Sequence, residues 1–76
     1  MELLQKLKEL RLKLAKEQNV PAYVVFPDKT LAQMANVQPV TRDDFLMIGG
    51  VGEKKLEEYF EPFSKTITAF IEENSQ

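Results

Sequence analysis

The 76-residue sequence contains no cysteine and no histidine. Without cysteine, the chain has neither a disulfide framework nor a thiolate ligand for a metal ion. Without histidine, it lacks the usual zinc ligand, the general base that works near neutral pH, and every Ser–His or Cys–His pair. We therefore expect no catalytic residues, no metal and no cofactor, and we do not expect this domain to be an enzyme by itself.

Long apolar segments are missing too, and nothing in the sequence looks like a signal peptide. Uninterrupted apolar runs are only a few residues long, whereas a membrane-spanning helix needs about 20. A chain of 76 residues is one domain, and a domain this small buries only about 60% of the surface that its unfolded chain exposes. We expect a single domain over residues 1–76, monomeric and cytoplasmic, with a small margin of stability.

Charges of the two signs nearly cancel, at a formal net charge of −2, but they are unevenly distributed. Residues 1–20 carry five basic side chains against three acidic ones, and residues 41–76 carry four against eight. A strong nucleic-acid-binding protein would be more basic, although a weak one could use a single face. The acidic face of residues 43–61 could instead meet a basic protein partner. Helix caps and exposed helix faces account for its acidic residues better than a metal site does: Asp43, Asp44, Glu53, Glu57 and Glu58.

Leucine spacing predicts a first helix over residues 2–18. Four leucines recur at intervals of four and three residues, which places them on one face of a helix: Leu3, Leu7, Leu10 and Leu14. Most of the other residues in this segment are strong helix formers. Asn19 is expected to end the helix, because Pro21 disfavours helical backbone at the residue before it.

Two shorter helices are expected next. Asp28 follows Pro27 and is a suitable N-cap for a helix that ends near residue 36. Thr41 and Asp44 form a capping box for another helix, with Asp in place of the usual Glu. The glycines at positions 49, 50 and 52 interrupt this third helix after a few residues.

A last amphipathic segment follows the glycines. Its apolar residues again recur every three or four positions: Leu56, Phe60, Phe63, Ile67 and Phe70. Pro62 lies within this pattern, removes one backbone donor and clashes with the carbonyl four residues earlier. We expect a kink near Glu58 or a break into two helices. The predicted fold class is therefore all-α, a compact bundle of about five helices.

The segment VPAYVVFPDKTL joins the first two predicted helices. It is too short and too isolated for a sheet strand, so we expect an irregular or 3₁₀ turn that places Phe26 and one of the valines in the core. Alternation along Tyr-Val-Val-Phe cannot bury every side chain. From these residues alone, a half-buried Tyr23 whose hydroxyl binds a nearby carbonyl is the favoured interpretation. The alternative is an outward Tyr23 that stacks on a nucleobase, with Lys16, Lys29 or Arg11 close to the backbone of the nucleic acid.

A glycine turn precedes the last helical segment, with Lys54 and Lys55 shortly after Gly50 and Gly52. Glycine permits a tight turn, and the first turn of the next helix exposes free N–H groups at the positive end of its dipole. A phosphate could bind there with help from the lysines. The simpler interpretation is a turn between packed helices, in which Glu53 satisfies the dipole. If Gly52 needs a positive φ, Gly52→Val should destabilise the fold.

Two stretches of the chain together resemble a known module: LRLKLAKEQNVPAYVVFPDKTLAQMA and LMIGGVGEKKLEEYFEPF. They are similar to the HRDC domain, the helicase-and-RNase-D C-terminal domain, and the likeness covers about residues 3–71. Its most specific parts are residues 20–31 and the Gly-Val-Gly turn with the Lys-Leu pair that follows. The Tyr-Val-Val-Phe passage looks more like the RecQ branch of DNA helicases than the RNase D branch. Gly49 departs from the family pattern, which often has proline there.

The resemblance implies a five-helix bundle at the C-terminal end of a larger ATP-dependent DNA helicase, which hydrolyses ATP elsewhere. Such a RecQ-like parent would act in DNA repair and recombination at the bacterial nucleoid. The domain itself would bind DNA weakly and without sequence preference, often as a single strand, or would dock on the helicase core or a repair partner. The DNA contacts implied by the family, and by a likeness of the glycine turn to helix-hairpin-helix proteins, are Tyr23, Lys16, Lys29, Gly50, Gly52, Lys54 and Lys55.

Overall fold

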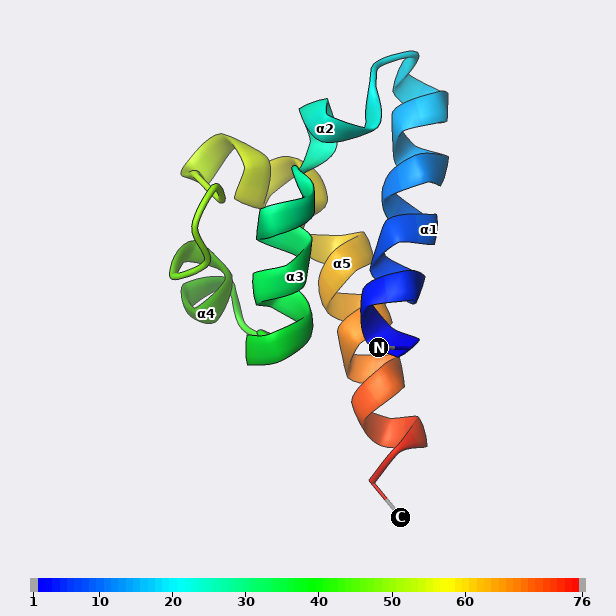
Figure 1. The fold of residues 1–76 in the computed structure, drawn as a ribbon. Helices are drawn as coiled ribbons and strands as arrows, with labels where there is room; N and C mark the ends of the chain where they lie inside the picture. The colour runs from blue at the N-terminus through cyan, green and yellow to red at the C-terminus, as the bar shows by residue number, and fades with distance from the viewer. Residues whose placement is uncertain (1, 76) are drawn as a thin grey trace.

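The computed structural model describes residues 2–75, and within this range all regular structure is helical. Five helices follow one another along the chain (Figure 1): α1 (Glu2–Gln18), α2 (Ala22–Val25), α3 (Asp28–Val37), α4 (Arg42–Leu46) and α5 (Glu53–Glu73). The predicted all-α class with about five helices is therefore confirmed. No helix within residues 2–75 is both long and apolar enough to cross a membrane.

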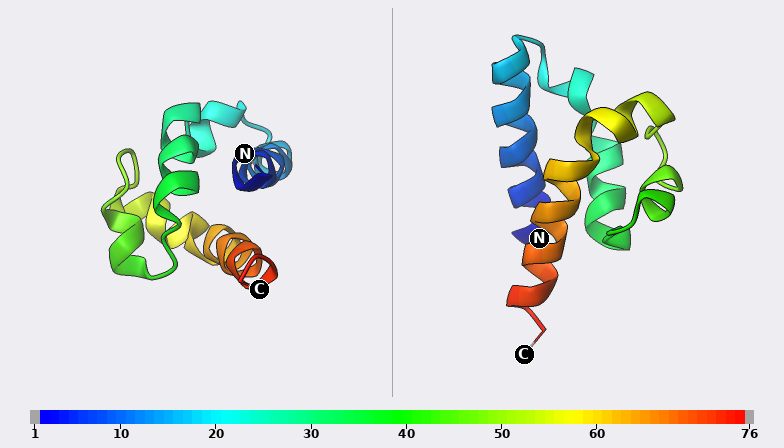
Figure 2. Two further views of the ribbon diagram at one scale, coloured as in Figure 1. Left: turned by 60° about the horizontal axis from the view of Figure 1, so that its bottom comes forward. Right: turned by 180° about the vertical axis from the view of Figure 1, so that it is seen from behind.

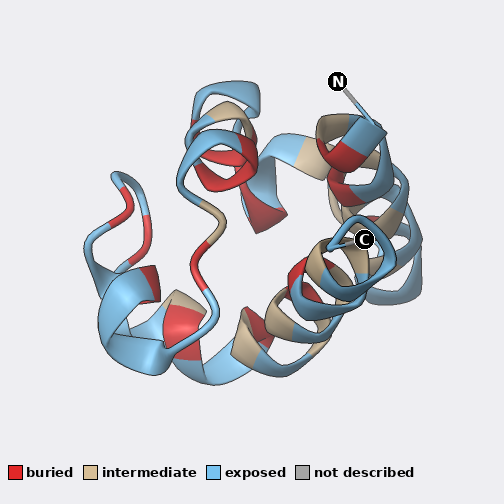
Figure 3. Cartoon of the chain, turned by 90° about the horizontal axis from the view of Figure 1, so that it is seen from below, coloured by how far each residue is buried: buried red, intermediate tan, exposed pale blue. Residues whose placement is uncertain are grey.

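The two long helices and α3 surround the core. Helix α1 packs against α2, α3 and α5, while α4 packs against α5. Figure 2 shows the same arrangement from two other sides, with the C-terminal part of α5 running alongside α1 and with α4 on the opposite side of α3. Buried residues line the sides of the helices that face one another, and the outward sides are exposed (Figure 3).

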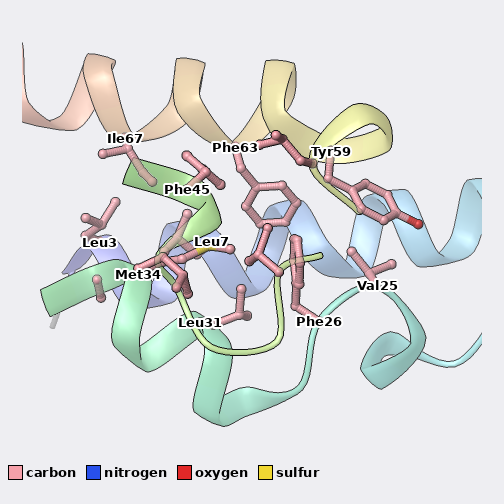
Figure 4. Packing of buried hydrophobic residues seen from close by; sticks show 14 of the residues in the cluster. Leu3, Leu7, Val25, Phe26, Leu31, Met34, Phe45, Tyr59, Phe63 and Ile67 are labelled. Carbon is pink, nitrogen blue, oxygen red and sulfur yellow. The ribbon is translucent and has the colours of Figure 1, made fainter. Parts of the chain in front are cut away.

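Phe26 lies at the centre of the core (Figure 4). Its ring meets the ring of Phe63 edge-on at a centroid distance of 5.1 Å and the ring of Tyr59 at 5.5 Å. Edge-to-face pairs of this kind add to the stabilisation from burial of the rings. The fully buried residues around them include Leu3, Leu7, Val25, Leu31, Met34 and Ile67. The core placement predicted for Phe26 is confirmed.

The leucine face predicted for α1 is confirmed, with a gradation along the helix. Leu3 and Leu7 are fully buried, whereas Leu10 and Leu14 are half-buried at the edge of the core. The helix ends as expected at Asn19, which adopts a left-handed φ of 58°. The Asn19 amide donates to the carbonyl of Lys16, and the next amide donates to the carbonyl three residues before the end of the helix. This pair of bonds is the Schellman motif, which satisfies carbonyls that the helix leaves free.

Helix α5 passes through Pro62 without a break. Figures 1 and 2 show that it changes direction between its N-terminal part and the longer part that runs beside α1. A kink, rather than two helices, is therefore the way in which the chain accommodates the proline. The face toward the core consists of Leu56, Tyr59, Phe63 and Ile67. Tyr59 was absent from the predicted pattern, which had used Phe60, a half-buried residue beside it.

One predicted helix start is confirmed and another is wrong. The hydroxyl of Thr41 accepts a 3.1 Å hydrogen bond from the amide of Asp44, which is the N-cap bond of the predicted capping box. Asp28, in contrast, is the first residue of α3 rather than its N-cap, and the capping position belongs to Pro27 without any side-chain bond. The reason is that the carbonyl of Pro27 already accepts bonds from the amides of Thr30 and Leu31, so helical backbone begins at Asp28. The Asp28 carboxylate pairs instead with Arg11 on α1, with Oδ1 2.7 Å from Nη1.

Candidate nucleic-acid interface

Helix α2 is a single turn between two prolines. Pro21 precedes it at φ −62°, which suits the start of a helix, and the amide of Val24 donates to the carbonyl of Pro21. Pro27 ends it, because the residue before a proline is pushed into extended backbone and Phe26 accordingly adopts φ −153°. The turn expected between the first two predicted helices is present as a single helical turn, Ala22–Val25. Its bond from the Val24 amide to the Pro21 carbonyl spans three residues, as in a 3₁₀ turn, and the two prolines fix both of its ends.

This turn distributes its side chains between the core and the solvent. Val25 and Phe26 are fully buried, Val24 is 38% exposed and Tyr23 is 70% exposed. The outward placement that the family resemblance implied for Tyr23 is confirmed, and the half-buried interpretation is wrong. A large aromatic ring that is exposed on a short, proline-bounded turn offers a flat surface on which a nucleobase can stack.

Two cationic side chains hold the carbonyl groups that follow Tyr23. The ammonium of Lys55 donates to the carbonyl oxygens of Val24 and Val25, the latter at 2.8 Å. The guanidinium of Arg11 donates to the carbonyl oxygen of Phe26 at 2.9 Å. Three consecutive carbonyls are therefore bound by side chains from α1 and α5.

Arg11 also forms the ion pair with Asp28. Its side chain is only 12% exposed, whereas that of Asp28 is 75% exposed. The hydrogen bond from Arg11, followed by the attraction of its charge, lowers the pKa of the Asp28 carboxyl below its ordinary value. Arg11 had been considered as a cation beside Tyr23 for the nucleic-acid backbone, but the structure engages its guanidinium with groups of the chain itself.

The glycine turn is anchored to α3. The Thr30 hydroxyl donates to the carbonyl oxygen of Gly49 at 3.0 Å, and the Gly49 amide donates to the side-chain oxygen of Gln33 at the same distance. Gly50 has a φ of +89°, and a Cβ atom built on it would lie 2.5 Å from the Thr30 hydroxyl oxygen. Both the backbone conformation and the close approach of α3 therefore require glycine at position 50.

Gly52 has a different role from the one considered for it. It is the N-cap of α5, its φ of −95° is open to any residue, and a Cβ there would meet nothing within 4 Å. The argument that Gly52→Val destabilises through a positive φ is wrong, because Gly50 takes that conformation instead. After the cap, Glu53 and Lys54 are exposed in the first turn of α5, while Lys55 is half-buried.

The structure places the predicted site residues in two groups. Lys16 at the end of α1, Tyr23 on α2 and Lys29 at the start of α3 are all exposed and lie on elements that meet at one end of the molecule (Figure 1). Gly50 and Gly52 lie in the turn before α5, along the far side of α3. The bond from Lys55 to α2 connects the start of α5 with the first group.

The acidic surface consists of residues on α4 and the first turns of α5. All five are exposed: Asp43, Asp44, Glu53, Glu57 and Glu58. Arg42 pairs with Glu57 and lies 5.3 Å from the ring centroid of Phe60. Within residues 2–75, no group of three or more acidic residues is arranged to hold a metal ion.

Several hydrogen bonds between distant parts of the chain were missed from the sequence. The Tyr59 hydroxyl donates to the side-chain oxygen of Gln18 at 2.8 Å, across 41 positions of the chain. Thr30 and Gln33, which hold the glycine turn, look like ordinary polar positions of α3. The spacing of Tyr59 four residues before Phe63 was a signal for its burial, since residues four apart share a helix face. No comparable signal existed for the contacts between helices.

Comparison with known proteins identifies the family of this five-helix fold. The family model described as HRDC domain matches residues 1–67. The solved structure titled D. radiodurans RecQ HRDC domain 3 superimposes with a TM-score of 0.87 at 38% sequence identity and covers 91% of each chain.

Similar curated proteins are much longer than this chain. The ATP-dependent DNA helicase RecQ of Bacillus subtilis is 45% identical over 69 residues, which cover 91% of this chain and 12% of the helicase. The RecQ of Pasteurella multocida is 44% identical over 66 residues, which cover 87% and 10%. The ATP-dependent DNA helicase UvrD2 of Mycobacterium tuberculosis H37Rv is 53% identical over 58 residues, which cover 76% and 8%. The chain therefore spans only about a tenth of the length of these relatives.

Proposed function

This chain belongs to the HRDC domain family, and on that premise we propose that it is the DNA-binding accessory domain of an ATP-dependent DNA helicase. It binds single-stranded or partly duplex DNA weakly and without sequence preference. Its parent is of the RecQ type, a helicase of DNA repair and recombination that acts in the cytoplasm at the bacterial nucleoid. UvrD2 is the second candidate for the parent, because those relatives share this domain as well.

The observation that carries this proposal is the exposure of Tyr23, which is 70% accessible although it is a large aromatic residue. Stacking of a base on such a ring contributes about 1–3 kcal/mol and does not depend on which base it is. Sequence-independent binding of a single strand is the function that such a surface serves best.

Phosphate contacts complete the proposed site. Lys16 and Lys29 lie on the elements that flank α2 and are exposed, so they are suited to pair with the backbone on either side of a stacked base. Lys54 and the amides of the Gly50 and Gly52 turn form the second group of proposed contacts. Binding through so few cations on a chain of net charge −2 is expected to be weak. Its dependence on salt should be shallow as well, because the slope scales with the number of phosphate contacts.

An NMR titration of the ¹⁵N-labelled domain with short oligo-dT tests this proposal. Shifts should cluster on Lys16, Tyr23, Lys29 and residues 50–55, and log Kd should change with log salt concentration by about 0.7 per phosphate contact. Tyr23→Ala should weaken binding by about tenfold or less, as expected for the loss of one stacked base. Its matched control is Val24→Ala, which shortens the next exposed side chain of the same turn.

Because Tyr23 is exposed, Tyr23→Ala should leave the melting temperature unchanged. A change in DNA affinity can then be assigned to the lost ring and not to a loss of folding. A Tyr23→Ala domain that melts like the unsubstituted domain and also binds oligo-dT equally well would refute the role of this residue. Absence of shifts at millimolar oligo-dT would refute DNA binding by the isolated domain as a whole. Sedimentation of the same sample tests the expected monomeric state.

The acidic surface on α4 and α5 favours a second candidate function, docking on the helicase core of the parent or on a repair protein. The excess of carboxylates on this surface is suited to a partner with a basic surface. Glu58→Lys should weaken the complex with the separately expressed core, whereas Glu72→Lys, on the exposed last turns of α5, should leave it unchanged. If NMR peaks and sedimentation are unaffected by the core, this candidate is wrong.

A further inference from the structure

The α2 turn that carries Tyr23 cannot hold its shape by its own hydrogen bonds. It spans only four residues, Ala22–Val25, and a helix this short is far below the length at which helices are stable in water. The last carbonyls of any helix have no partner within it. In α2 the carbonyls in question belong to Val24 and Val25, immediately after Tyr23 in the chain.

Lys55 supplies the missing partner for both carbonyls. Its ammonium donates to the oxygens of Val24 and Val25 across about 30 positions of the chain. The same ammonium lies 5.6 Å from the ring centroid of Phe26 and 5.9 Å from that of Tyr59. A cation at the carbonyl end of a helix is favourable through its hydrogen bonds and through the helix dipole, and the two rings add cation–π attraction.

The two lysines after the glycine turn therefore differ in what they face. Lys54 is exposed and free to meet a phosphate, whereas Lys55 is half-buried and directs its ammonium at the chain's own carbonyls. If Lys55 turned toward a phosphate, it would leave the carbonyls of Val24 and Val25 without these donors. This geometry argues against a direct phosphate contact by Lys55.

We propose that Lys55 is a positioning residue for Tyr23, holding the carbonyl end of α2 so that the ring is presented to a base in one orientation. Arg11 extends the support by one carbonyl, that of Phe26. The inference rests on the proposed DNA contact of Tyr23 and deepens it, because it assigns to Lys55 a role that acts through the ring and not through its own charge.

A comparison of Lys55→Met with Lys54→Met separates positioning from phosphate contact. Each change removes one charge, and the two positions are neighbours in the sequence. Lys55→Met should weaken binding to oligo-dT by about two- to tenfold with an unchanged salt slope, because only stacking is impaired. Lys54→Met should reduce the salt slope by about 0.7. Lys55→Arg keeps a cationic donor and should restore most of the affinity.

A double-mutant cycle gives the sharpest test. If Lys55 acts only through the ring, Tyr23→Ala combined with Lys55→Met should bind oligo-dT no more weakly than Tyr23→Ala alone. Additive losses, together with a salt slope reduced by about 0.7, would overturn the inference and make Lys55 a phosphate contact. If the methionine variant does not melt cooperatively, Lys55→Ala takes its place, since it also removes the donor and places no long apolar side chain at this half-buried position.

Hydrogen exchange keeps this inference testable even if the domain does not bind DNA. In Lys55→Met, amides of α2 should exchange faster while those in the middle of α1 and α5 keep their protection. Suppose that α2 exchanges faster in Lys55→Met and that the unsubstituted domain does not bind oligo-dT. The proposed function would then be refuted, but the stabilisation of α2 by Lys55 would be supported. Unchanged exchange in α2 would overturn the inference whatever the DNA result.

Discussion

Substitution of Gly50 by alanine should destabilise the domain strongly, and the structure allows the size of the effect to be worked out. A φ of +89° is unfavourable for any residue with a Cβ atom, by about 1–2 kcal/mol. The new methyl group would also lie 2.5 Å from the hydroxyl oxygen of Thr30, which is buried on α3. Overpacking of this kind costs about 1–3 kcal/mol.

Together these effects predict a loss of about 2–5 kcal/mol in the free energy of unfolding. That is a large part of the total for a domain of this size, which is about 4–11 kcal/mol at typical values per residue. Since 1 kcal/mol corresponds to about 4–8 °C for such domains, the melting temperature followed by circular dichroism should fall by about 10 °C or more.

Neighbouring glycines provide matched controls. A Cβ on Gly52 would meet nothing within 4 Å, and one on Gly49 would meet only the end of the Gln33 side chain at 3.2 Å. Gly52→Ala should therefore be nearly neutral, and Gly49→Ala should have a small effect. Thr30→Ala removes the hydroxyl oxygen that the new methyl group would clash with. The double variant should therefore lose about 1–3 kcal/mol less unfolding free energy than the sum of the two single variants. If Gly50→Ala melts within a few degrees of the parent, or if Gly52→Ala loses as much, the reasoning is refuted.

Two further predictions concern the core and the ion pair between α1 and α3. Phe63→Ala, at a fully buried position, should cost about 3–5 kcal/mol in urea unfolding, and Leu10→Ala should cost clearly less because that side chain is half-buried; equal losses would contradict the assigned core. Arg11 lowers the pKa of Asp28. The ion pair therefore contributes its full stabilisation above the carboxyl's unfolded pKa of about 3.9, and this stabilisation is lost as the pH falls through the lower pKa of the folded state. The difference in melting temperature between the parent and Asp28→Asn should accordingly vanish in acid and shrink with salt; a difference independent of pH would refute this assignment.

Helix positions were largely predictable because the interactions that define them are local. Leucine spacing located α1, the hydroxyl of Thr41 located the start of α4, and Asn19 located the end of α1. Each of these signals connects residues within one or two helical turns. Asp28 shows the limit of such reasoning, because the N-cap position belongs to Pro27 and the Asp28 carboxylate pairs with a residue on another helix.

The candidate site was predictable only in part for the same reason. Two prolines and a run of four apolar residues were enough to place Phe26 inside, whereas the outward position of Tyr23 was expected from the resemblance to the HRDC family. The direction of the Lys55 ammonium was not predictable, because its partners lie about 30 positions earlier in the chain. For Gly50 and Gly52 the sequence pattern is nearly symmetrical, so it did not indicate which one takes the positive φ.

The sequence by itself determined the helical class and the helix boundaries to within a few residues. These follow from periodicity, caps and prolines, which act over a few residues. The resemblance to the HRDC family rests on two matching stretches of sequence, and it is this resemblance that implied an exposed Tyr23. Only the tertiary structure decided that Lys55 and Arg11 bind the carbonyls behind Tyr23, that Thr30 requires glycine at position 50, and that Asp28 pairs across to α1. Those outcomes depend on which helices pack together, and a hydrogen-bond donor takes whichever acceptor the packing brings within about 3 Å.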